Sequence, residues 1–84
     1  MSRQLIAELV RAHIMATRPP ETRDLDFADG SSLVVTHILD SVGVFTLVAF
    51  LEERFSIEVP DRDLDWKNFE TVDAITRFVE SKLR

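Results

Sequence analysis

The chain has 84 residues, of which 45% are hydrophobic and 30% charged, and this composition fits one folded domain (residues 1–84) with a modest core. Its net charge of −5 arises after residue 23, where six Lys or Arg face thirteen Asp or Glu, so a nucleic-acid binder, which needs a basic surface, is excluded. The absence of cysteine excludes disulfides, thiolate nucleophiles and cysteine-based metal sites.

The first predicted element is an amphipathic helix over residues 2–15, with Ser2 as its N-cap. Glu8 and Arg11 interrupt the apolar run of roughly 7 to 15 residues that a signal peptide needs, and no run approaches the ~20 residues of a membrane span. We therefore expect a cytoplasmic protein without membrane contact. Pro19 and Pro20 end the helix. The residues expected to form its apolar face are Leu5, Ile6, Leu9, Val10 and Ile14.

A long connection without a regular period, residues 17–39, follows the first helix. A loop of this length is uncommon in a compact domain unless it is functional. Asp29-Gly30-Ser31 predicts a turn, and residues 32–37 are compatible with a short helical turn. We expect the connection to be held across the core by its apolar side chains, namely Leu25, Phe27, Leu33, Val34, Val35, Ile38 and Leu39.

The strongest periodic segment predicts a helix from Ser41 to Phe55. Asp40 stands where an N-cap belongs, so Ser41 is expected to be the first helical residue. Phe45 and Phe50 are core candidates at the two edges of the apolar face, and one of them is expected to be partly exposed. The residues of that face are Val44, Leu47, Val48, Leu51 and Phe55.

The segment after this helix is predicted to be extended over residues 56–60, because Pro60 restricts the residue before it. One short helical turn is expected over residues 61–67, with Leu64 and Trp66 facing inward. Three aspartates here, Asp61, Asp63 and Asp65, imitate the start of a calcium loop. Trp66 occupies the position where that loop needs Gly, so we expect a solvated acidic turn and no metal site.

The last predicted helix is capped by Thr71 and runs to Leu83. Its expected buried residues are Val72, Ile75, Phe78 and Val79. Taken in order, the elements predict an all-α fold, a four-helix bundle of three main helices plus one short helix, with a long first loop.

Ser41 is the residue whose position is suited to carry chemistry. A hydroxyl in the first turn of a helix lies where unpaired backbone N–H groups and the positive end of the helix dipole stabilise an anion, such as a phosphodiester. Taken alone, however, Asp40-Ser41 is more often only a helix start. A hydrolase elbow is excluded because Leu39 occupies the first Gly position of Gly-x-Ser-x-Gly. His13 and His37 are expected to be surface or partly buried residues rather than catalytic bases.

The order of motifs along the chain resembles the acyl carrier protein family. That family opens its second helix on an Asp-Ser-Leu-type motif, similar to Asp40-Ser41-Val42. It leaves that helix through a Leu-Glu-Glu-x-Phe-x-Ile-x-(Ile/Val)-Pro-type segment, similar to residues 51–60. Upstream, residues 32–41 resemble the family's loop approach, and residues 68–75 resemble the entry into its last helix. The resemblance thus covers nearly the whole chain in the right order.

The resemblance implies a carrier protein that is not itself an enzyme. Ser41 would receive a covalent phosphopantetheine arm from coenzyme A through a phosphopantetheinyl transferase, with Asp40 as the motif aspartate and helix cap. The arm's thiol would hold acyl or aminoacyl groups as thioesters. Further implied partners are an acyl- or aminoacyl-activating ligase and downstream biosynthetic enzymes of a fatty acid, polyketide or nonribosomal peptide pathway. The carrier is expected to be a monomer.

The residues expected to bind partners combine a small apolar centre with an acidic rim: Val42, Val44, Ala49, Glu52 and Glu53. Gly43 replaces an acidic residue that is frequent in the family, so the face is less acidic at the motif and leans toward a stand-alone carrier in a specialised pathway. Two alternatives stay open. The acidic surface could serve solubility alone, and the chain could be an unmodified helical protein-interaction module.

Overall fold

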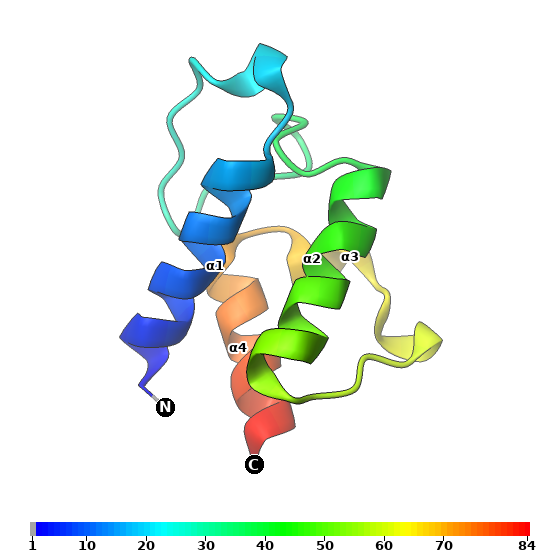
Figure 1. Ribbon diagram of the computed structural model, residues 1–84. Coiled ribbons are helices and arrows are strands. Elements are labelled where there is room, and N and C mark those ends of the chain that lie inside the picture. The colour runs from blue at the N-terminus through cyan, green and yellow to red at the C-terminus, as the bar shows by residue number, and fades with distance from the viewer. Residues whose placement is uncertain (1) are drawn as a thin grey trace.

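The computed structural model describes residues 2–84 and confirms the predicted all-α bundle (Figure 1). Its main helices are α1 (Arg3–Thr17), α2 (Ser41–Phe55) and α4 (Val72–Leu83), and the short one is α3 (Trp66–Phe69). Two 3-10 turns, η1 (Pro20–Thr22) and η2 (Asp61–Asp63), lie in the connections. Within residues 2–84 no helix is long and apolar enough to span a bilayer.

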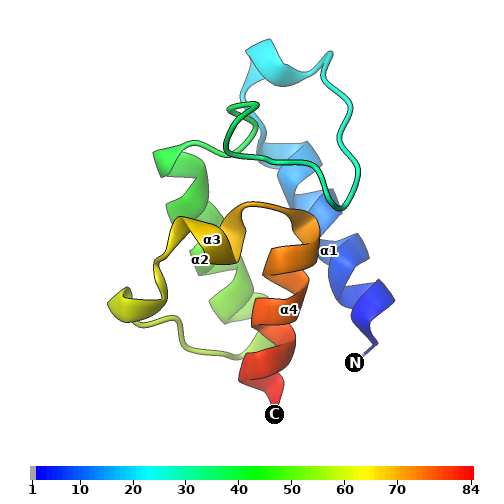
Figure 2. The ribbon, with the colours of Figure 1, turned by 180° about the vertical axis from the view of Figure 1, so that it is seen from behind.

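Helix α1 begins at the predicted cap, because the Ser2 hydroxyl accepts a hydrogen bond from the Leu5 N–H. It packs mainly against α4, which lies between α1 and α2 when the bundle is seen from behind (Figure 2). Three residues of the expected apolar face, Ile6, Val10 and Ile14, are buried. Leu5 was expected there too, but it is exposed because it lies at the edge of the stripe, about 100° from Ile6 around the helix.

The long connection between α1 and α2 is held to the core by part of the expected set: Phe27, Leu33, Ile38 and Leu39 are buried. The expectation was wrong for Leu25 and Val35, which are exposed. Two arginines, Arg11 of α1 and its C-cap Arg18, explain the path of the chain there. The guanidinium of Arg11 lies 4.5 Å and that of Arg18 5.4 Å from the centre of the Phe27 ring.

Hydrogen bonds from the same two arginines satisfy carbonyl groups of the loop. Arg18 donates to the carbonyls of Thr22 and Leu25, and Arg11 donates to Phe27 O at 3.1 Å and to Asp29 Oδ1 at 2.9 Å. These bonds fix the Leu25 backbone beside α1 while its side chain faces outward. Ionic and cation–π contacts, not apolar burial alone, therefore hold the first half of this loop.

The second half of the loop contains the predicted turn, closed by the Ser31 N–H donating to Ala28 O at 3.0 Å. Residues 32–37 form turns rather than a helix. His37 adopts a left-handed conformation with φ of 62°, which stops helical propagation. The Leu33 N–H donates to Glu70 O at 2.7 Å, so this part of the loop is tied to the segment just before α4.

The connection from α2 to α4 differs from its prediction. The expected single turn over residues 61–67 is divided into η2 and α3, because Leu64 has non-helical dihedral angles (φ −80°, ψ 56°). Leu64 and Trp66 were expected to face inward but are 37% and 55% exposed. Phe69, at the end of α3, fills the core in their place with 1% exposure.

Helix α4 is capped and buried as predicted. The Thr71 hydroxyl accepts from the Ala74 N–H at 2.9 Å, and Val72, Ile75, Phe78 and Val79 all lie in the core. Near its C-terminal end, Lys82 forms a 2.6 Å ion pair with Asp63 of η2. The core therefore occupies the space between α1, α2 and α4, and the N-terminus of α2 is left at the end of the bundle where the long loop arrives (Figure 1).

Candidate functional site

The first turn of α2 has the geometry predicted for it. Asp40 is extended (φ −97°, ψ −175°), and its Oδ1 accepts a hydrogen bond from the Gly43 N–H at 2.7 Å. The Asp40 carbonyl accepts from the Val44 N–H at 2.8 Å, the first bond of the helix. The N–H groups of Ser41 and Val42 lie before that bond and point out of the helix tip. Ser41 is exposed beside them.

Gly43 allows the cap to close tightly. A Cβ at this position would lie 3.2 Å from Asp40 Oδ1 and 3.2 Å from Leu39 Cδ1. A larger residue would therefore displace the capping carboxylate, the buried Leu39 side chain, or both. The sequence predicts only a loss of acidity at Gly43, whereas the packing shows that the missing side chain leaves room for the cap. The contact with Leu39 spans only four residues, but it depends on Leu39 being turned into the core ahead of the cap.

The loop before the cap is fixed on its inner side. The Leu39 N–H donates to Leu33 O at 2.9 Å, and both side chains are buried, Leu33 completely. Because Leu33 is in turn bonded to Glu70, the residue preceding Asp40 is linked to the start of α4. The Ser41 hydroxyl therefore follows a loop whose backbone is tied to the core by these two hydrogen bonds.

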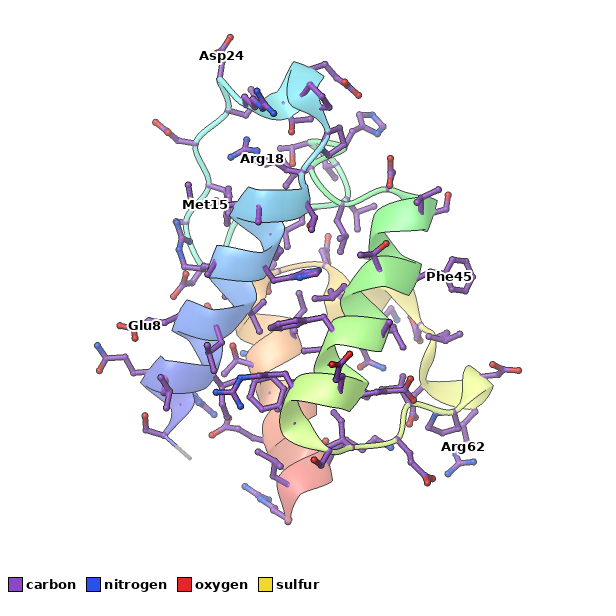
Figure 3. The ribbon with its side chains drawn as sticks, in the orientation of Figure 1. Glu8, Met15, Arg18, Asp24, Phe45 and Arg62 are labelled. Atoms are coloured by element: carbon purple, nitrogen blue, oxygen red, sulfur yellow. The ribbon has the colours of Figure 1, made fainter. Side chains whose placement is uncertain are left out.

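The apolar residues expected to bind partners divide between two sides of α2. Val42 is 74% exposed and Ala49 is exposed. Val44, which is expected both on the apolar face of the helix and in the partner-binding centre, is half-buried and packs against the core. The expectation that Val44 is exposed to partners is therefore wrong. Of Phe45 and Phe50, one of which was expected to be partly exposed, Phe45 is the exposed residue at 67% and points away from the bundle (Figure 3). Phe50 is half-buried.

The two glutamates expected at the rim have different surroundings. Glu52 Oε2 accepts a hydrogen bond from the Val59 N–H at 3.0 Å, so this carboxylate also anchors the connection that follows α2. Glu53 borders an open groove of about 420 Å³ together with Phe50 and Arg54. Glu53 is thus the rim carboxylate without a hydrogen bond to the loop.

The two histidines have different surroundings. His13 stacks on Phe50 with ring centres 4.3 Å apart, and Phe50 lies nine residues, or about 13 Å, farther along α2 than Ser41. The Nε2 atom of His13 is buried without a hydrogen-bond partner among the described residues, and burial lowers the pKa of His13 below its ordinary value of 6.5. His37 is exposed in the loop.

These features fit a covalently attached phosphate group at the tip of α2. An exposed hydroxyl lies beside two outward N–H groups, and the capping Asp40 carboxylate is directed inward to Gly43.

The chain's match to known proteins agrees with this chemistry. The family model described as "Phosphopantetheine attachment site" matches residues 3–79. No curated protein matches the chain. Since the match covers almost the entire chain, the protein belongs to the phosphopantetheine attachment-site family, the acyl and peptidyl carrier proteins, whose members carry a covalently attached phosphopantetheine group.

Proposed function

We propose that this protein is a single-domain carrier in which Ser41 bears the phosphopantetheine arm. The observation that supports this most strongly is the exposed Ser41 in the first turn of α2, next to the capping residue Asp40. Both residues lie within the segment that the family model covers. The arm's terminal thiol would hold an acyl or aminoacyl group as a thioester. The chain's own residues would hold the arm's phosphate at the helix tip and keep its point of attachment rigid.

The carrier role explains why such a small bundle would be useful without catalysing a reaction. Tethering an intermediate raises its effective concentration at each enzyme that binds the carrier. The partners of this proposal are a phosphopantetheinyl transferase, an acyl- or aminoacyl-activating ligase and downstream biosynthetic enzymes, which act on a monomeric carrier in the cytoplasm. Successive enzymes must exchange on one face, so each complex is expected to be weak.

The proposed partner face extends along α2 from its N-terminal tip toward its C-terminal half. It contains Val42 and Ala49 as exposed apolar residues and Glu53, with Glu52, as its acidic end. Reversal of both charges by Glu52→Lys and Glu53→Lys is expected to slow partner reactions. Unchanged rates for every partner would contradict the contribution of charge. Because Glu52 also bonds to Val59, the single Glu53→Lys variant separates partner binding from local structure.

Intact-mass analysis tests the proposed attachment. The purified protein is incubated with coenzyme A and a broad-specificity phosphopantetheinyl transferase, and the expected gain is one phosphopantetheine per chain. Ser41→Ala should abolish the gain. Ser81→Ala is a matched control because Ser81 is also an exposed helical serine, in α4. No gain in the unaltered chain, under conditions that modify a known carrier, would favour an unmodified protein-interaction module.

A further inference from the structure

The long connection between α1 and α2 consists of two halves that are held to the bundle by different forces. In residues 31–39 the buried side chains are all apolar. Residues 19–30, which we call the strap, bury only Thr22 and Phe27. Figures 1 and 2 show the strap leaving the C-terminal end of α1 and returning along α1, on the side away from α2. The strap therefore has little apolar attachment to the core.

Two guanidinium groups hold the middle of the strap. Arg18 donates hydrogen bonds to the carbonyls of Thr22 and Leu25. Arg11 donates to Phe27 O at 3.1 Å. The same two groups lie over the Phe27 ring, with Arg11 at 4.5 Å and Arg18 at 5.4 Å from its centre. Loss of either group would therefore uncover the ring and release a backbone carbonyl at the same time.

The end of the strap is held by an ion pair that solvent reaches. Arg11 Nη1 lies 2.9 Å from Asp29 Oδ1, and the two side chains are 34% and 45% exposed. Dissolved salt screens an ion pair of this exposure. The Asp29 carbonyl also accepts a hydrogen bond from the Asp73 N–H at 3.0 Å, in the first turn of α4. Arg11 thus contacts the ring, a carbonyl and the carboxylate, so closure of the strap depends most on this residue.

The half of the loop that leads to Ser41 is anchored independently of the strap. The Leu33 N–H donates to Glu70 O at 2.7 Å, and the Leu39 N–H donates to Leu33 O at 2.9 Å. Both bonds join backbone groups outside the strap, and the side chains of Leu33 and Leu39 are buried. Opening of the strap would therefore leave the proposed attachment residue in place.

We propose that the strap opens and closes as one unit while the rest of the bundle stays folded, and that Arg11 and Arg18 set the balance between the two states. The inference goes beyond the carrier function proposed above and does not depend on it. Segments with few buried apolar contacts open at a lower free-energy cost than the core. The open state releases both guanidinium groups and exposes Phe27, whereas Ser41 keeps its position. Ionic strength is the condition that shifts the balance, because salt screens the Arg11–Asp29 pair.

Hydrogen exchange followed by NMR separates the strap from the rest of the loop. The Arg23 and Leu25 N–H groups bond to carbonyls within the strap, so their exchange reports its opening. Arg11→Gln should accelerate the exchange of both by roughly tenfold or more, because the side chain loses its charge and its ion pair with Asp29. The two anchoring N–H groups of the other half of the loop should stay within about twofold of the unaltered chain.

Arg3→Gln is the matched control, because Arg3 is also in α1 and pairs at 2.8 Å with Glu80 of α4, not with the strap. It should leave exchange in the strap unchanged. Raising NaCl from roughly 50 to 500 mM should accelerate exchange in the strap of the unaltered chain, and should have a smaller effect in Arg11→Gln. The salt series on the unaltered chain needs no substitution, so it decides the question even if a variant does not fold.

Two results would overturn the proposal. Equal acceleration in both halves of the loop would show that the strap and the rest of the loop open together. Exchange in the strap that stays within about twofold, both in Arg11→Gln and at high salt, would show that the two arginines do not control its closure.

Discussion

The inner and outer faces of α2 are both rich in apolar residues, yet they have opposite surroundings. On the inner face Leu47 and Leu51 are completely buried, and they pack into the core with α1 and α4. On the outer face Val42 and Phe45 are 74% and 67% exposed. Hydrophobicity alone therefore does not decide burial in a small domain. An apolar side chain left in solvent beside Ser41 adds little to stability, which is compatible with the partner face proposed above.

The largest expected difference between the faces is in stability. Leu47→Ala is expected to lower the free energy of unfolding by about 2–5 kcal/mol, because it removes a completely buried side chain and leaves a cavity. Phe45→Ala removes a larger side chain and should cost less than about 0.5 kcal/mol, because most of that ring is already in water. Urea denaturation measures both. A similar loss in the two variants would show that the outer face contributes to the core.

The N-cap Asp40 stabilises the first turn of α2, from which both faces start. Asp40→Ala should destabilise the protein by about 1 kcal/mol, because the Gly43 N–H loses its acceptor. Thr71→Ala provides the comparison, since Thr71 caps α4 through the same kind of bond to Ala74. Thermal unfolding of both variants measures the effect. Full stability of Asp40→Ala would mean that water or another group replaces the cap.

A third test concerns the inner side of α2 near His13. Burial lowers the pKa of His13 in the folded protein, so between this pKa and 6.5 the unfolded chain binds more protons. Stability should therefore be complete above about pH 6.5 and fall as the pH drops below it. Urea midpoints at pH 7.5 and pH 5.5 measure the decrease, and His13→Phe should reduce it. His37→Gln, which alters an exposed histidine, should not. An equal decrease in the His13→Phe variant would assign it to other groups.

The smallest expected effect is at Gly43. Replacing Gly by Ala inside an exposed helix normally stabilises by up to about 1 kcal/mol. Here the new Cβ would lie 3.2 Å from both Asp40 Oδ1 and Leu39 Cδ1. These contacts should offset the gain, so Gly43→Ala is expected to change stability by less than about 0.5 kcal/mol. A gain of the full helix-propensity value would show that the cap tolerates a side chain at this position.

The sequence predicts features that depend on neighbours along the chain. Ser2, Asp40 and Thr71 were all identified as caps, because a cap needs only a side-chain oxygen and an N–H group three residues away. The start of α2 follows for the same reason, and its predicted end at Phe55 is confirmed. The residue after it, Ser56, was predicted to be extended but is left-handed (φ 56°, ψ 44°). The family resemblance likewise depends on the order of short motifs, and the match over residues 3–79 confirms it.

Features that depend on tertiary contacts were missed or misplaced. Arg11 and Arg18 enclose Phe27 and thereby fix the path of a loop whose apolar pattern wrongly placed Leu25 inside. Trp66 was expected in the core by its hydrophobicity, but Phe69 fills that space. Periodicity indicates which of Phe45 and Phe50 is the exposed one, since Phe45 lies about 160° from Leu47 around α2.

Peptide mapping of the modified protein locates the phosphopantetheine arm that is proposed on Ser41. After incubation with coenzyme A and the transferase, the protein is digested and the arm is located by tandem mass spectrometry. If Ser41 is the attachment residue, one phosphopantetheine is expected on Ser41 and none on the Ser41→Ala variant. An arm on any other residue, or an unmodified chain beside a fully modified control carrier, would contradict it.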